Sequence, residues 1–288
     1  MFYFRLMGGL GNQMFQYAAG KALSIKRGIP IKVDFDCPYP HIKYEYSLGI
    51  FKLHAEFATP RELRRCKPKR RLAKRLYLLL GKNPECLLLR ERRDFHFQSD
   101  LFLAPDGSYI SGFWQSEKYF NDIADIIRND FSFRSPPDGE NQKLCTQMRN
   151  RESVSLHIRR GDYVRVESAN KVHGVCSPSY YKNSVAYILN RMPNAVFYIF
   201  SDDMQWVKAN FQLAAPTIFV DINSSHNAYE DMRLMSHCKH HIIANSSFSW
   251  WGAWLNVNPD KIVIAPAKWM NDPKAIVKDL LPDSWIRL

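Results

Sequence analysis

The regular alternation of strand-like and helical segments in the second half of the chain is the feature that most constrains its fold. Short apolar runs typical of buried strands occur at residues 154–158, 195–200, 217–220, 241–244 and 262–265. Helical patterns lie between them, around residues 180–191, 204–211, 229–238 and 247–255. Strands that alternate with helices over roughly 120 residues predict parallel βαβ units with right-handed crossovers.

The first half begins in the same order, with a strand at 2–6, a glycine loop at 8–11, a helix at about 13–27 and a strand at 31–35. Residues from about 38 to 106 have weak periodicity and are expected to form helices and loops. The sequence RSPPDGEN at 134–141 is the best linker, because its prolines and Asp-Gly interrupt helices and strands. We therefore predict an α/β protein of two Rossmann-like domains, residues 1–138 and 139–288, facing across a cleft. The C-terminal tail is able to pack back on the first domain.

Composition excludes several classes of protein. The apolar fraction of 46% in 288 residues indicates a folded globular chain. No run of 18 apolar residues is present, so we expect no transmembrane helix. The N-terminus lacks the continuous apolar region of a signal peptide. The six cysteines are dispersed, without a C-x-x-C pair, which favours reduced thiols in a cytoplasmic protein.

The net charge of +12 is concentrated in one segment. From Arg61 to Arg75 the chain carries nine Lys or Arg residues and one Glu, and leucines at helical spacing follow it. Two interpretations stay open: a solvated surface helix, or peripheral contact with an anionic membrane. We do not expect a nucleic-acid partner, because no recognisable binding motif accompanies the cations.

The glycine loop GGLGNQ at 8–13 lets the backbone approach a ligand closely at a helix N-terminus. A dinucleotide fingerprint would require a third glycine where Met14 stands, so a dehydrogenase is disfavoured. A glycine turn that binds no ligand is the alternative. This part of the chain by itself does not decide between them.

Polar residues also follow three of the predicted strands in the second half. The stretch SLHIRRGDYV at 155–164 ends in two arginines, which suit a phosphate because guanidinium binds oxygens bidentately. A structural Arg–Asp pair is the alternative, and an RGD adhesion module is a remote one. Asp202 and Asp203 either bind a base or sugar or cap the next helix. Asn245, Ser246 and Ser247 place N–H groups and hydroxyls at a helix start, where an anion can bind.

Two literal matches to metal motifs are weak. Asp34 and Asp36 form a D-x-D triplet, which is short enough to occur by chance. His237, His240 and His241 are spaced only loosely like metal ligands, and the last two lead into a buried strand whose alternate side chains point apart. We therefore expect no metal site.

Four longer motifs together resemble a known family. They are GGLGNQMFQYA at 8–18, HIRRGDY at 157–163, FYIFSDD at 197–203, and the block from Glu230 through IIANSSFSWWGAWL at 242–255. These motifs are similar to those of the α-1,2-fucosyltransferases of glycosyltransferase family 11, of the bacterial type. The resemblance spans almost the whole chain and is weakest from about residue 38 to 106. It implies a GT-B fold and inverting, metal-independent transfer of L-fucose from GDP-β-L-fucose to the 2-hydroxyl of a galactose. No cofactor is implied.

The resemblance also implies roles for individual residues. His157 and Asp231 are expected to contact the guanosine, with Arg159 on the β-phosphate. Asn12 is expected to face the reacting sugar, by similarity to the protein-O-fucosyltransferases, and Asp162 to brace the arginine loop or act directly. Other residues expected to bind the donor are Gly11, Asp202, Asn245, Ser246, Ser247 and Phe248. The acceptor implied is a galactoside glycan such as an O-antigen or capsule repeat, in some cases lipid-linked, at the inner face of the cytoplasmic membrane.

The sequence does not identify the general base of the transfer reaction. Asp162, Asp34 and a water held by Asn12 are all candidates. A fucosyltransferase of another linkage is the main competing interpretation of the function.

Overall fold

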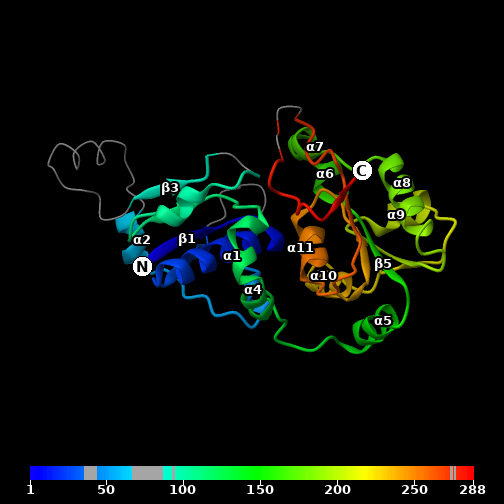
Figure 1. Ribbon diagram of the computed structural model, residues 1–288, viewed down its shortest axis with the longest axis horizontal. Coiled ribbons are helices and arrows are strands. Elements are labelled where there is room, and N and C mark those ends of the chain that lie inside the picture. The colour runs from blue at the N-terminus through cyan, green and yellow to red at the C-terminus, as the bar shows by residue number, and fades with distance from the viewer. Residues whose placement is uncertain (36–43, 67–86, 93–94, 273–274, 276) are drawn as a thin grey trace. The chain divides into compact units, whose positions relative to one another are not determined.

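The computed structural model describes residues 1–35, 44–66, 87–92, 95–272, 275 and 277–288. The chain divides into two compact units. Unit 1 comprises Met1–Arg134 with Val277–Leu280, and unit 2 comprises Ser135–Ile276 with Leu281–Leu288. The division therefore falls inside the linker sequence, four residues before the boundary expected from the sequence. Figure 1 shows the elements of both units.

Unit 1 is built on a parallel sheet of four strands in the order β2-β1-β4-β3. The strands are β1 (Phe2–Leu6), β2 (Ile31–Phe35), β3 (Leu88–Arg90) and β4 (Tyr109–Ser111). The helix α1 (Leu10–Arg27) connects β1 to β2 in the expected crossover. Its first turn has no side-chain cap, and its last turn carries Lys26 and Arg27, whose charges suit the negative end of the helix dipole.

The middle of the chain differs from the sequence prediction. Besides β3, its described residues form the helix α2 (Pro60–Cys66) and the single 3-10 turns η1 (Leu48–Ile50) and η2 (Ser99–Leu103). The short turns η3 (Glu117–Tyr119) and η4 (Asn121–Ile123) and the helix α4 (Ala124–Asp130) complete unit 1. A strand of three residues is too short for a visible pattern, which is why β3 was not predicted. Most of the basic segment lies outside the described residues, as does Asp36.

Unit 2 contains a parallel sheet of six strands in the order β10-β9-β8-β5-β6-β7. Its strands are β5 (Ser153–Ile158), β6 (Val196–Ser201), β7 (Thr217–Phe219), β8 (His240–Ile242), β9 (Val263–Ala265) and β10 (Ile286–Arg287). The central strand β5 is buried at every residue, as a strand covered on both faces must be. Five of these strands match the predicted runs to within one or two residues, and β10 was not predicted.

The helices of unit 2 begin where the sequence supplies capping groups. Asp138 accepts the N–H of Asn141 at the start of α5 (Gly139–Arg149), directly after the prolines of the linker. Ser177 accepts the N–H of Tyr180, and proline occupies the first turn of α8 (Pro178–Leu189). The remaining helices are α6 (Gly161–Arg165), α7 (Glu167–His173), α9 (Met204–Asn210), α10 (Tyr229–His237) and α11 (Ser247–Leu255).

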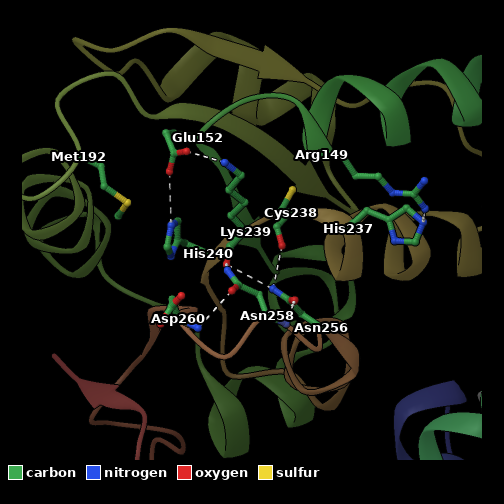
Figure 2. Close-up of a pocket in the computed structure, with 10 residues that line it drawn as sticks. All are labelled: Arg149, Glu152, Met192, His237, Cys238, Lys239, His240, Asn256, Asn258 and Asp260. Atoms are coloured by element: carbon green, nitrogen blue, oxygen red, sulfur yellow. Dashed lines mark hydrogen bonds and ion pairs between the residues drawn. The ribbon is translucent and has the colours of Figure 1, made fainter.

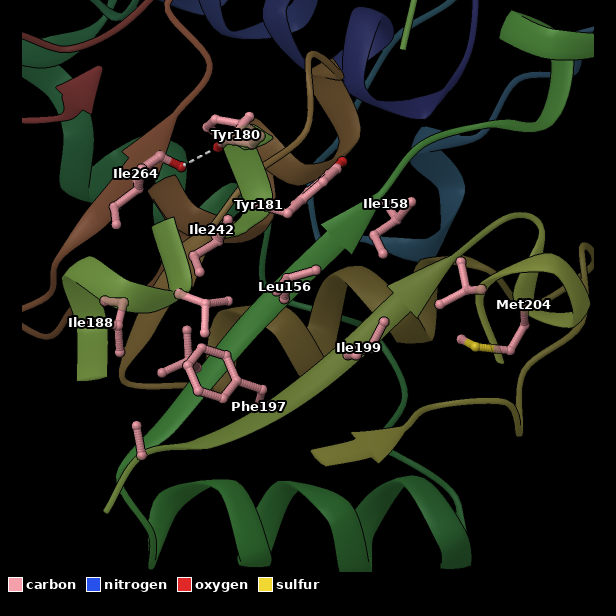
Figure 3. Close-up of a cluster of buried hydrophobic side chains, with 14 residues drawn as sticks. Leu156, Ile158, Tyr180, Tyr181, Ile188, Phe197, Ile199, Met204, Ile242 and Ile264 are labelled. Atoms are coloured by element: carbon pink, nitrogen blue, oxygen red, sulfur yellow. Dashed lines mark hydrogen bonds between the residues drawn. The ribbon is translucent and has the colours of Figure 1, made fainter. Parts of the chain in front are cut away.

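The core of unit 2 packs α8 against the sheet. Leu156, Phe197, Ile199 and Ile242 project from adjacent strands onto the helix, as Figure 3 shows. In the same region, the hydroxyl of Tyr180 donates to the carbonyl of Ile243, just beyond β8, and to that of Ile264 in β9. This packing holds the carboxyl ends of the central strands in a fixed register. The α/β fold class and the two Rossmann-like units are confirmed, and the cleft between them stays a prediction.

Among the described residues, no helix is both long enough and apolar enough to span a membrane.

Candidate functional site

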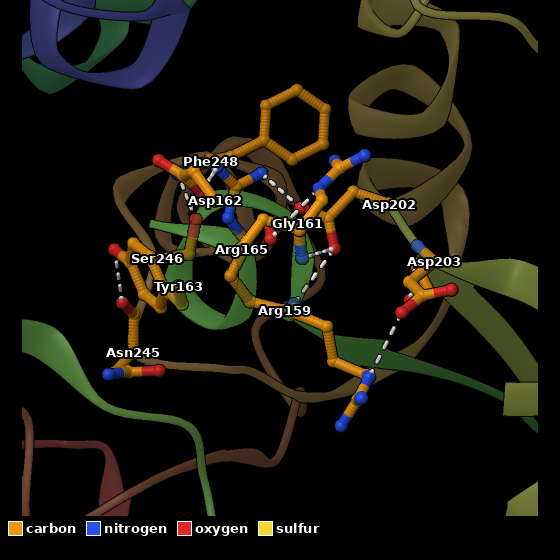
Figure 4. A network of polar contacts seen from close by, with 12 residues as sticks. Arg159, Gly161, Asp162, Tyr163, Arg165, Asp202, Asp203, Asn245, Ser246 and Phe248 are labelled. Carbon is orange, nitrogen blue, oxygen red and sulfur yellow. Dashed lines mark hydrogen bonds and ion pairs between the residues drawn. The ribbon is translucent and has the colours of Figure 1, made fainter. Parts of the chain in front are cut away.

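The polar residues predicted to act together follow the carboxyl ends of three adjacent strands, at the same edge of the unit 2 sheet. β5 lies between β8 and β6, and all three run parallel. Arg159 follows β5, Asp202 follows β6, and Ser246 lies beyond β8 at the start of α11. Figure 4 shows these side chains close together. Carboxyl ends of parallel strands are where ligands bind in folds of this type.

Arg159 is held by two carboxylates. Its Nη1 lies 2.8 Å from Oδ2 of Asp202, and its Nη2 lies 2.5 Å from Oδ1 of Asp162. Burial opposes its charge, but the carboxylates of Asp202 and Asp162 hold the pKa of Arg159 above its ordinary value. The side chain is still 29% exposed. A fixed, permanently charged guanidinium is therefore presented at the edge of the sheet.

Asp202 braces the loop that carries Arg159. Its Oδ1 accepts the backbone N–H groups of Arg160, at 2.8 Å, and Gly161, at 3.1 Å. A Cβ atom at Gly161 would lie 2.1 Å from Oδ2 of Asp202, so only glycine fits there. The contacts of Asp202 shown here are with the protein's own loop, and its role in donor binding stays a prediction.

Arg160 makes different contacts from Arg159. Its Nε lies 3.2 Å from Oδ2 of Asp203, and its guanidinium stacks 3.4 Å from the centroid of the Trp206 ring. Asp203 also caps α9 through the N–H of Trp206, which is the capping role weighed from the sequence. Arg160 therefore braces this corner. Asp162, expected to brace the arginine loop or to act directly, pairs with Arg159 within the loop, and a direct role for it stays a prediction. With both charged ends of the RGD tripeptide engaged internally, an adhesion role finds no support.

His157 lies on β5 and is 5% exposed. Its ring centroid is 6.0 Å from that of Phe248 on α11, and its Nδ1 has no hydrogen-bond partner among the described residues. Burial lowers the pKa of His157 to about 4. The imidazole is therefore neutral near pH 7, and its contact with guanosine stays a prediction.

The lowered pKa of His157 predicts a loss of stability in acid. Between about pH 6.5 and 4 the unfolded state binds a proton that the folded state excludes, so the free energy of unfolding falls as the pH falls. Urea denaturation at pH 6.5 and 5.0 should show that His157→Gln reduces the loss of stability by about 1.5 kcal/mol. Other histidines, such as His237, whose pKa burial also lowers to about 4, keep their own contribution to the loss. His54→Gln, at an exposed histidine, is the control. An unchanged difference in the His157 variant would contradict the assignment.

The N-terminus of α11 lies next to this histidine. Ser246 caps the helix by accepting the N–H of Phe248 at 3.3 Å. Ser246 is buried, while Ser247 and Phe248 are half-buried. The capping hydroxyl and the first N–H groups of the helix thus have the positions predicted for them, and their part in binding an anion stays a prediction.

Asn245 has a structural role that the sequence did not reveal. Its amide nitrogen lies within 3.3 Å of three carbonyl oxygens, those of His173, Gly174 and Trp269. The side chain is 2% exposed. It therefore ties the end of β8 to the end of α7 and to the segment after β9. Its predicted contact with a donor stays a prediction.

We expect Asn245→Ala to lower the free energy of unfolding by about 2–4 kcal/mol, because buried carbonyls lose their donor. Asn210→Ala is the matched control, since the exposed amide of Asn210 makes one bond to the Trp206 carbonyl. Its expected cost is below about 0.5 kcal/mol. Chemical denaturation of both variants makes the comparison, and equal costs would refute the structural role.

Asp231 is carried by α10. Its Oδ1 accepts a hydrogen bond from the Asn223 amide at 2.8 Å. Burial raises the pKa of Asp231 to about 6. The carboxyl therefore titrates near the physiological range, and its contact with guanosine stays a prediction.

The predicted residues of the glycine loop, Gly11 and Asn12, lie at the start of α1 in unit 1. The Oδ1 of Asn12 accepts a hydrogen bond from Nε2 of Gln115 at 2.7 Å. Gln13, which the sequence analysis did not single out, is fully buried and joins the carbonyls of Gly8 and Glu45 through its amide. No sequence signal marks Gln115, because it lies far from Asn12 along the chain.

Asp34, a candidate base, is 6% exposed and accepts a hydrogen bond from the Tyr109 hydroxyl. The weak metal motifs find no counterpart: the described residues contain no group of three or more His, Cys, Asp or Glu side chains placed to hold a metal ion.

A pocket of about 540 Å³ lies elsewhere in unit 2 (Figure 2). It is next to Glu152 and Lys239, which precede β5 and β8, so it is at the opposite edge of the sheet from Arg159. Four of the residues that line it pair with one another: Lys239 with Glu152, and Arg149 with His237. The pocket is therefore not part of the candidate site.

Comparison with known proteins shows that this chain is a glycosyltransferase. Residues 97–288 match glycosyl transferase family 11. The chain is 36% identical to the alpha-1,2-colitosyltransferase of Escherichia coli, across 99% of this chain and 97% of that protein. It is 33% identical to the O-antigen biosynthesis glycosyltransferase WbnK of Escherichia coli, across 99% and 100%. Human galactoside alpha-(1,2)-fucosyltransferase 1 is 27% identical, across 51% and 42%.

The chain belongs to glycosyltransferase family 11, and it is a transferase of the fucosyl or colitosyl type. The family predicted from the motifs is confirmed.

Proposed function

We propose that this protein transfers L-fucose, with inversion, from GDP-β-L-fucose to the 2-hydroxyl of a galactose in a glycan acceptor. The names of the colitosyl and fucosyl relatives both carry the α-1,2 linkage, and the human relative acts on a galactoside. Colitose is fucose without its 3-hydroxyl, so the two donors share the same reacting carbon. The observation that carries the proposal is the juxtaposition of Arg159, neutral His157 and the N-terminus of α11 at one sheet edge.

Arg159 is proposed to stabilise the leaving group. Cleavage of the fucosyl–phosphate bond leaves negative charge on GDP and gives the sugar oxocarbenium character. A guanidinium fixed by Asp162 and Asp202 is preorganised for that charge, and so are the N–H groups at the start of α11. His157 and Asp231 are proposed to contact the guanosine, with Ser246, Ser247, Phe248 and Gly11 around the diphosphate. No metal ion or other cofactor is part of this proposal.

The general base is proposed among Asp162, Asp34 and a water held by Asn12. A pH–rate profile of variants at each position tests this, because loss of the true base removes one limb of the profile.

The acceptor is proposed to be an O-antigen or capsule type of glycan, because one relative is named for O-antigen biosynthesis. Such a glycan is built on a lipid at the cytoplasmic face of the membrane, where the basic segment from Arg61 to Arg75 is proposed to make peripheral contact. If neutralising these cations leaves binding to anionic vesicles unchanged, this contact is excluded.

The deciding experiment offers GDP-fucose and GDP-colitose separately to the protein with a β-galactoside acceptor, followed by linkage analysis of the product. We expect faster transfer of fucose and an α-1,2 product. Preference for GDP-colitose would favour the second candidate function, colitosyl transfer, which the 36% identity supports. A product of another linkage would refute the proposed regiochemistry.

A further inference from the structure

Asn223 has a side chain whose hydrogen-bonding capacity is fully used. An amide group can donate two hydrogen bonds and accept two, and this one makes all four. Its Nδ2 donates to Oδ1 of Asn141 at 3.0 Å and to Oδ1 of Asp231 at 2.8 Å. Its Oδ1 accepts from the amides of Asn141 and Asn227, both at 3.0 Å. Turning the amide over would set its oxygen against the Asp231 carboxylate, so Asn223 is held in one orientation.

The two amides that hold Asn223 are themselves anchored. Asn141 is 1% exposed and also donates to the carboxylate of Asp138, the cap of α5, at 2.8 Å. Asn227 accepts the backbone N–H of Ser224 at 2.7 Å, which closes the loop that carries Asn223. The network therefore ties together the start of α5, the loop after β7 and the start of α10.

This network lies at the carboxyl edge of the unit 2 sheet, as Arg159 does. Asn223 comes after β7, which pairs with β6, and β6 is the strand that Asp202 follows. Asp231 and Asn141 lie in the first turns of α10 and α5, which lead into the parallel strands β8 and β5. Such helices run opposite to the strands, so both begin at the carboxyl edge. Asp231 is therefore on the edge where ligands bind in this type of fold.

The carboxylate of Asp231 is held at one oxygen only. Asp231 is half-buried, and its Oδ1 accepts the Asn223 amide. Its Oδ2 makes no hydrogen bond or ion pair with a described residue, and it is not among the polar atoms that are shut off from water. A fixed acceptor is thus left open at this edge of the sheet.

The charge of Asp231 depends on its surroundings. Burial raises its pKa to about 6, and the nearby carboxylates of Glu230 and Asp221 add to the rise. The hydrogen bond from Asn223 opposes the rise, because it favours the charged form. No described residue forms an ion pair with Asp231. The other charged or titratable side chains of the surrounding segments are Asp138, Glu140, His226, Tyr229, Lys208, which pairs with Asp221, and Arg233, which pairs with Glu230.

We propose that Asn223 is a positioning residue, which holds the Asp231 carboxylate so that its Oδ2 accepts the N–H groups of the guanine base of the donor. Guanine carries two adjacent donors, at its ring N1 and its exocyclic amine. A charged carboxylate accepts such bonds more strongly than a neutral carboxyl group does. The inference rests on the proposed function, in which Asp231 contacts the guanosine, and it adds the residue that orients Asp231 and keeps it charged.

Calorimetric titration with GDP, without acceptor, tests the proposal at pH 6.0 and 8.5. Asp231→Asn should bind GDP at least about tenfold more weakly than the wild type at pH 8.5. Asn223→Leu loses the donor, so the pKa of Asp231 should rise by about one unit. This variant should bind about fivefold more weakly than the wild type at pH 6.0 and within about twofold of it at pH 8.5. The titration of GDP itself is the same for every variant and cancels in the ratio.

Asn227→Ala is the matched control, because it removes another bond to Asn223 in the same loop and leaves the bond to Asp231 in place. Its affinity for GDP, relative to the wild type, should not change between the two pH values. Asn223→Asp is the second variant, for use if Asn223→Leu does not fold. It keeps the oxygen that Asn141 and Asn227 contact but sets another oxygen against Asp231, so its loss at pH 6.0 should be at least as large.

Equal losses at both pH values in the Asn223 variants would show that the residue only braces the loop, and they would overturn the proposal. Tight binding of GDP by Asp231→Asn at pH 8.5 would overturn it as well. Fucosyl transfer by the wild-type protein is measured in parallel. If GDP binds with the expected pH dependence but no fucosylated product forms, the proposed function fails and the role of Asn223 stands. If product forms and the pH dependence is absent, only the role of Asn223 fails.

Discussion

Replacing Arg159 by alanine should lower the kcat for transfer about 1000-fold at saturating donor, while the protein stays folded. The loss has two sources. The guanidinium that faces the departing phosphate is removed, and the carboxylates of Asp162 and Asp202, which it neutralises at 2.5 and 2.8 Å, remain as uncompensated negative charge. Both effects raise the free energy of a transition state in which GDP becomes more negative.

The neighbouring arginine provides the comparison. Arg160→Ala removes an ion pair with Asp203 and the stacking on Trp206, which affects the corner of the loop rather than the phosphate. We expect it to lose less than about tenfold in kcat and to reduce stability by about 1 kcal/mol. Arg159→Lys should recover little activity, because one ammonium cannot contact two carboxylates and a phosphate with the same geometry. Near-normal turnover by Arg159→Ala would refute the assignment of this residue to the leaving group.

Gly161→Ala should disable the same site without removing any charged group. The new methyl would stand 2.1 Å from Oδ2 of Asp202, the atom that holds Nη1 of Arg159. Either Asp202 moves away from the guanidinium or the loop shifts away from the strand end. We expect a loss of about 1–3 kcal/mol in the free energy of unfolding, typical of overpacking, and a fall of at least about 100-fold in kcat.

Gly139→Ala is the matched control, because Gly139 is also the first residue of a helix and a Cβ atom there meets nothing within 4 Å. That variant should be as stable as the wild-type protein or more stable by up to about 1 kcal/mol. Denaturation curves and initial rates, measured side by side, make the test. If both alanine variants behave alike, the close contact between Gly161 and Asp202 is not what holds Arg159.

The local pattern of the chain was enough to predict the elements around the site. The apolar runs that became β5 and β6 are buried almost throughout, and a continuous apolar run of this length is typical of a parallel central strand. Short elements escaped prediction, among them β3 and β10, because two or three residues carry no detectable period. The helix α5 was missed because its apolar stripe is weak, and its capping residue follows two prolines.

By itself, the sequence determined the family, the strand–helix alternation, and the placement of His157, Arg159, Asp202 and Ser246 at strand ends. Each of these features depends on residues that are neighbours along the chain, so it can be predicted from a local sequence pattern. Only the tertiary structure decided which groups meet. Asp202 reaches Arg159 because β5 and β6 pair in register, and Gln115 reaches Asn12 because β4 lies beside β1. Such contacts join residues far apart in sequence, and sheet order and strand register, rather than composition or spacing, bring them together.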